Sequence, residues 1–133
     1  MSKVSSSSHF VKRPEAPGSS SEAYWAPNTD VYETDSGLVI KVELAGMRRE
    51  DLQVEIEGNI LKISGQRPDG CRAPKCKFLV MEINYGAFQS VLELPPGYDL
   101  SQAKAAYLNG FLRIDVPLKP GASRTLSVQM DLD

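Results

Sequence analysis

Two cysteines and several neighbouring carboxylates are the residues of this chain whose types and spacing could do chemistry. Cys71 and Cys76 lie in the segment CRAPKC, a spacing that suits a short disulfide loop or half of a zinc site. A zinc site needs further Cys or His ligands, and the only histidine, His9, lies in the N-terminal segment, so no complete metal site is encoded. We expect two reduced loop thiols without a dedicated role, and redox sensing is the alternative.

Catalytic groupings are also missing from the sequence. A serine or cysteine nucleophile needs a base beside it, and the single histidine lies outside the patterned part of the chain. The glycine-rich motifs that bind phosphate groups do not occur. Glu55 and Glu57 alternate with apolar residues, which is typical of the solvent face of a strand and not of an acid–base pair. The sequence therefore predicts a binding module that is not an enzyme and needs no cofactor.

Composition narrows the class of protein. The chain has 133 residues, of which 41% are hydrophobic and 24% charged, the profile of one folded domain. Its net charge is -2 and its Lys and Arg residues are spread along the chain, so it lacks the concentrated positive charge that binding to nucleic acid requires. Its apolar runs are far shorter than the about 20 residues that span a membrane, and its N-terminus lacks the apolar core of a secretory signal. We expect neither nucleic acid nor membrane as a partner, and a cytoplasmic location.

The chain begins with a serine- and proline-rich segment. The strand-like alternation of apolar and polar residues, which must position any site, starts after it. We expect residues 1–28 to form a flexible arm, residues 29–119 a domain, and residues 120–133 a C-terminal extension. Trp25, near the edge of the domain, is expected to pack against it.

Within the domain, apolar and polar residues alternate in short runs bounded by turn residues, as strands with one buried face do. The runs are 37–44, 53–65, 77–83, 85–94 and 105–118. Residues 101–108 would suit a helix by composition, but their place before Asn109-Gly110 favours a strand, because Asn-Gly between alternating runs is typical of a type I′ hairpin turn. Seven or eight such strands predict an all-β, two-sheet antiparallel β-sandwich.

Three blocks of residues 30–119 resemble the alpha-crystallin domain of the small heat-shock proteins, most closely the bacterial and plant type. The blocks are DVYETDSGLVIKVELAGMRREDLQVEIEGNILKISGQR, YGAFQSVLELP and AAYLNGFLRIDVPLK, in that order. The chain departs from the family pattern at Ala45, where proline is usual, at Ser90, where arginine is usual, and at Ala103, which replaces a larger aliphatic residue.

The resemblance implies an immunoglobulin-like sandwich, homodimers, and ATP-independent holding of partly unfolded client proteins. It also implies that a strand of one subunit pairs with the first strand of the other. The residues implied in this exchange are Asp30, Val31, Tyr32, Glu33, Lys77, Phe78, Leu79, Val80, Met81 and Glu82.

Higher homo-oligomers are implied by a C-terminal tripeptide that inserts into an apolar groove of a neighbouring domain. Leu126 and Val128, separated by one serine, fit that tripeptide. The groove would consist of Val54, Ile56, Ala103, Ala105 and Tyr107. The alternative function is that of a CS-type co-chaperone or another interaction module of the same fold, but such domains lack both the Asn-Gly hairpin signature and the tripeptide.

Overall fold

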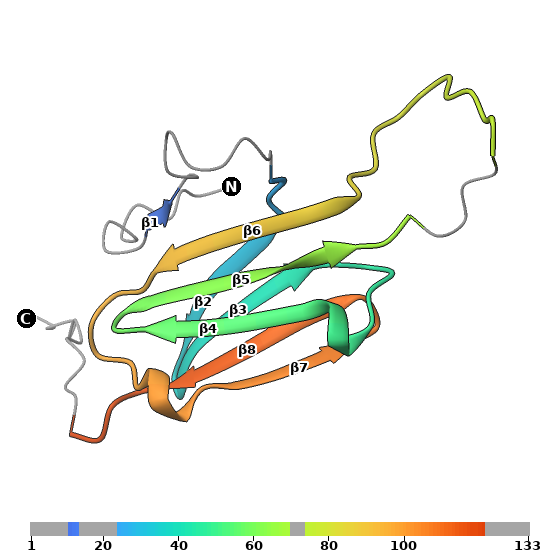
Figure 1. Cartoon of the computed structure of the whole chain (residues 1–133). Coiled ribbons are helices and arrows are strands. Elements are labelled where there is room, and N and C mark those ends of the chain that lie inside the picture. The colour runs from blue at the N-terminus through green and yellow to red at the C-terminus, as the bar shows by residue number, and fades with distance from the viewer. Residues whose placement is uncertain (1–10, 14–23, 70–73, 122–133) are drawn as a thin grey trace, which may run out of the picture.

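The computed structural model describes residues 11–13, 24–69 and 74–121, which fold as two antiparallel sheets packed face to face (Figure 1). One sheet has the strand order β1-β6-β5-β4 and the other β2-β3-β8-β7. The strands are β1 (Val11–Arg13), β2 (Thr29–Thr34), β3 (Gly37–Glu43), β4 (Leu52–Glu57), β5 (Ile60–Arg67), β6 (Gly86–Glu93), β7 (Lys104–Leu108) and β8 (Phe111–Pro117). Helix in the described residues is limited to the short 3-10 turns η2 (Arg49–Asp51) and η3 (Leu100–Gln102). The predicted all-β sandwich is confirmed.

The core lies between the sheets and follows the period-two pattern of the sequence. Successive side chains of a strand point to opposite faces, so every second residue of β3, β5, β6 and β8 faces inward. Burying each large apolar side chain contributes about 1.5–3 kcal/mol to stability. The most completely buried apolar residues are Ile40, Val42, Leu44, Leu61, Ile63, Phe88, Leu92, Leu94, Ile114 and Val116.

The turn between β7 and β8 has the geometry that its residue types predict. Asn109 has φ 54° and Gly110 has φ 84°, both in the left-handed region that a type I′ turn requires. The turn places Leu108 opposite Phe111 and Tyr107 opposite Leu112, so Leu112 enters the core. Residues 104–108 are a strand, as the position of the Asn-Gly pair favoured.

The outer edge of β6 is covered by two segments from the N-terminal part of the chain. β1 pairs with residues 91–93, and the backbone of Trp25 bonds to Ala87 O at 3.3 Å and to Gln89 N at 3.0 Å. The Trp25 ring lies 5.2 Å from the ring of Phe88, which confirms that Trp25 packs on the domain. The strand at Val11–Arg13 was not predicted, because its few residues carry no alternation that distinguishes them from a loop.

The predicted strand at residues 77–83 is wrong for the isolated chain. These residues carry no strand and belong to a connection between β5 and β6 that projects away from the sandwich (Figure 1). A strand needs a neighbouring strand for its backbone hydrogen bonds, and no described segment of the chain lies beside this one as a ladder partner. The alternation of residue types is present, but the pairing is not.

Ser90 lies within the core at the point where the chain departs from the family pattern. It faces inward from β6 between Phe88 and Leu92 and is only 2% exposed. Its hydroxyl has no hydrogen-bond partner among the described residues. Removing a hydroxyl from water without a replacement bond costs stability, so this position weakens the core.

Replacing Ser90 with alanine should therefore raise the free energy of unfolding by about 1 kcal/mol, since the substitution removes the unpaired hydroxyl and leaves the rest of the core in place. Urea denaturation of wild type and S90A measures the change. Ser64→Ala is the matched control, because Ser64 is half-buried on the neighbouring strand β5; it should change stability by less than about 0.5 kcal/mol. A large loss of stability in S90A would contradict the prediction and indicate a partner for the hydroxyl.

Candidate protein-interaction site

The connection between β5 and β6 exposes a run of apolar side chains. Leu79 is 87% exposed and Val80 is 73% exposed, and the remaining members of the run, Phe78, Met81 and Ile83, are exposed as well. Lys77 and Glu82, also exposed, flank the centre of the run. Contiguous exposed apolar surface of this kind marks a site of contact with another protein. All of the predicted exchange residues from 77 to 82 therefore face solvent in the single chain.

The second half of the predicted exchange site is the outer edge of β2. This strand pairs only with β3 among the described residues, so its other edge is free to pair. Asp30, Tyr32 and Glu33 are exposed along it, while Val31 packs on the core. The Tyr98 hydroxyl donates a hydrogen bond to the Glu33 carboxylate at 2.5 Å, which fixes the end of β2 to the connection after β6. Residues 30–33 and 77–82 do not pair with each other within the chain.

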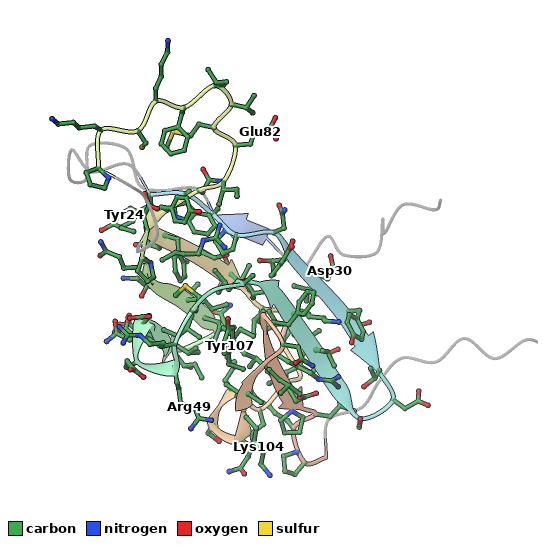
Figure 2. All side chains as sticks on the ribbon, turned by 90° about the vertical axis from the view of Figure 1, so that its right-hand side faces the viewer. Tyr24, Asp30, Arg49, Glu82, Lys104 and Tyr107 are labelled. Carbon is green, nitrogen blue, oxygen red and sulfur yellow. The ribbon has the colours of Figure 1, made fainter. Side chains whose placement is uncertain are left out.

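The residues of the predicted groove lie along β4 and just before and within β7, the outermost strands of the two sheets (Figures 1 and 2). Val54, Ala103 and Tyr107 are partly buried and pack against the core. Ile56 is 42% exposed, and Ala105 is exposed. Neither of the two edges has a partner strand among the described residues, and the core covers these apolar side chains only in part.

Tyr107 holds β7 in place through its phenol group. The hydroxyl donates a hydrogen bond to Leu44 O at 2.6 Å and accepts one from Met47 N at 3.1 Å. Both partners belong to the connection that follows β3. The edge strand β7 is therefore bound both to β8 and to the connection after β3. These contacts keep its apolar side chains in a fixed position.

Carboxylates of β4 and of the turn before it have structural partners. Asp51 Oδ2 accepts a hydrogen bond from Arg48 N at 3.1 Å and lies 3.4 Å from Arg48 Nε, which closes the turn η2. Glu55 lies 4.0 Å from Lys62 Nζ across the β4–β5 ladder. These contacts stabilise local structure on the surface, each by at most about 1 kcal/mol.

The chemistry-bearing residues of the sequence are only partly within the described structure. Cys76 is exposed and free, whereas Cys71 and the tripeptide residues Leu126 and Val128 lie outside the described residues. Where the chain is described, no cluster of at least three His, Cys, Asp or Glu side chains could hold a metal ion. The same residues contain no helix with the length and apolar character needed to cross a membrane.

One group of contacts was missed at the sequence level, namely those of Arg67 with Trp25 and Tyr85 at the base of the β5–β6 connection. In the sequence, Arg67 ends a strand-like run, while Trp25 and Tyr85 lie far from it or in another run. Their spacing gives no indication that the three side chains meet. Only the fold brings the three together.

The sequence matches a known protein family and several of its members. Residues 30–130 match the family model described as the Hsp20/alpha crystallin family. Small heat shock protein C2 of Rickettsia felis is 35% identical over 84% of this chain and 73% of its own length. The 17.6 kDa class I heat shock protein 3 of Arabidopsis thaliana is 35% identical over 79% of this chain and 68% of its own length.

Solved structures agree in fold. HspA from Xanthomonas axonopodis superposes with a TM-score of 0.67 at 31% identity, covering 74% of this chain and 98% of that one. A small heat-shock protein from Xylella fastidiosa gives a TM-score of 0.67 at 27% identity, covering 83% and 100%. With the sandwich, the hairpin and the family match in agreement, this chain belongs to the Hsp20/alpha-crystallin family, the small heat-shock chaperones.

Proposed function

We propose that this protein is an ATP-independent holdase, which binds partly unfolded proteins in the cytoplasm and delays their aggregation. The observation that carries the proposal is the apolar surface along the outer edges of β4 and β7, where Ile56 is 42% exposed and neither edge has a partner strand among the described residues. Unfolding proteins expose apolar side chains and unpaired strands, and both bind to surfaces of this kind without an energy source. Family membership supports the chaperone role.

In this proposal the functional unit is a homodimer. Residues 77–82 of each subunit pair with residues 30–33 of the other, so a two-fold axis makes the same contact twice. Residues 77–82 are exposed and carry no strand, and β2 has no strand along its outer edge among the described residues, which supports the exchange. Residues 29–119 act as the binding domain, and residues 1–28 and 120–133 act as arms.

Higher homo-oligomers form through the C-terminal extension. Leu126 and Val128 insert their side chains along β4 and β7 of a neighbouring subunit, where Val54 and Tyr107 are partly buried and Ile56 is exposed. The small residues Ala103 and Ala105 leave room for the incoming side chains. Burying them there would cover apolar surface that the chain alone leaves in water.

Holding activity is tested by light scattering from a heated client protein. The purified protein should lower the scattering at an equimolar ratio, and added ATP should not change the result, because burial of apolar surface drives the binding. No effect at several-fold excess would contradict the proposal. Recovery of one stable folded partner in a pull-down, without any suppression of scattering, would instead indicate the co-chaperone function.

Strand exchange is tested by Val80→Pro. Proline removes a backbone donor, so the paired segment should fail to form and the protein should sediment as a monomer. Val80→Thr is the control, because threonine retains the donor and the strand preference, and this variant should keep the wild-type mass. Val80 is 73% exposed in a loop, so urea denaturation of the monomer should change by less than about 0.5 kcal/mol in either variant. An unchanged mass for V80P would refute the exchange.

The role of the extension is tested with the double substitution Leu126→Ser and Val128→Ser. Loss of both apolar side chains should reduce the assembly to dimers, as measured by size exclusion with light scattering. Met130→Ser with Leu132→Ser, an equal loss of apolar character farther along the tail, should leave the particle mass unchanged. If both double variants keep the wild-type mass, the tripeptide is not an anchor.

A further inference from the structure

Arg67 occupies the point at which the chain leaves the sandwich to form the β5–β6 connection. It is the last residue of β5 and lies opposite Gly86, the first residue of β6, as the final pair of that ladder. Its side chain continues past this pair, and Nε donates a hydrogen bond to Asn84 O at 2.9 Å. The guanidinium thus joins the start of the connection to its end.

The same guanidinium contacts a third part of the chain. Its Nη1 donates a hydrogen bond to Ala45 O at 3.2 Å, in the connection that follows β3. Two carbonyl groups from separate segments are therefore held by the planar fork of one side chain. Lysine, with a single point charge on a flexible stem, cannot reproduce this geometry.

Two aromatic rings complete the surroundings of Arg67. The guanidinium carbon lies 4.5 Å from the centre of the Trp25 ring and 5.8 Å from that of Tyr85, both within the range of cation–π attraction. The Trp25 indole also donates a hydrogen bond to Gly86 O at 3.2 Å. Tyr24, just before Trp25, and Glu82 in the connection lie toward the same end of the molecule (Figure 2).

From these contacts we propose that Arg67 is a positioning residue for the exchange segment, residues 77–82. It holds together the two ends of the β5–β6 connection and binds them to Trp25, where the N-terminal arm joins the domain. A segment that pairs with a partner subunit loses conformational entropy on binding. When the two ends of its connection are already held together in the single chain, less entropy remains to be lost on dimerisation. Arg67 therefore strengthens the dimer without touching the partner. This inference rests on the proposed strand exchange.

The test compares Arg67→Lys with Arg113→Lys. Both keep the positive charge, but Arg113 is an exposed residue of β8, in the sheet that does not contain Arg67, and it bonds to Asp115 on its own strand. Trp25 is the only tryptophan of the chain, so its fluorescence reports directly on the contact. In R67K, acrylamide should quench Trp25 more strongly, and trypsin should cut faster after Lys75 and Lys77. The dissociation constant of the dimer should rise about tenfold. None of these should change in R113K.

Urea denaturation of both variants separates positioning from a merely structural role. Lower stability of R67K with an unchanged dissociation constant would overturn the inference, and so would unchanged quenching and cleavage. If the wild type is itself a monomer, strand exchange fails as a proposal. Quenching and cleavage then still decide whether Arg67 closes the base of the connection: an increase in both supports the closure, and no change overturns it.

Discussion

The backbone groups along the edge of a β-sheet require hydrogen-bond partners, and this requirement governs how the molecule is arranged. The edge at β6 is covered within the chain, by β1 and by the backbone of Trp25. The outer edges of β2, β4 and β7 have no strand beside them among the described residues. The described part of the chain thus covers one border of the sandwich itself and leaves the other borders to be covered by another chain, as the proposed function requires.

The sequence predicted the parts of the structure that depend on local pattern. Alternation in β3, β6 and β8 identified the buried faces, because one side of each strand meets the other sheet. Asn109-Gly110 identified the hairpin, because few other residue pairs accept positive φ at both positions. Tyr32 and Ile56, which the family resemblance implies in contacts between subunits, are exposed on edge strands.

The features that the sequence did not predict depend on partners that are distant or outside the chain. Residues 77–83 carry the pattern of a strand but have no ladder within the described residues, since pattern records the preference of a segment and not the presence of a neighbour. The contacts of Arg67 with Trp25 and Ala45 join residues that are remote in sequence, and no spacing rule connects them. The strand β1 is too short for periodicity to reveal it.

The separation of the exposed run at 78–83 from the sandwich has a consequence for how such proteins diverge. Side chains such as Leu79 and Val80 are largely exposed to water, so mutation can alter them with little effect on folding. Core residues such as Ile40 and Phe88 have no such freedom. Under the proposed strand exchange, two sister chains that arise by gene duplication could therefore acquire different segments at these positions on the same sandwich. Each would then pair with its own kind in a shared compartment.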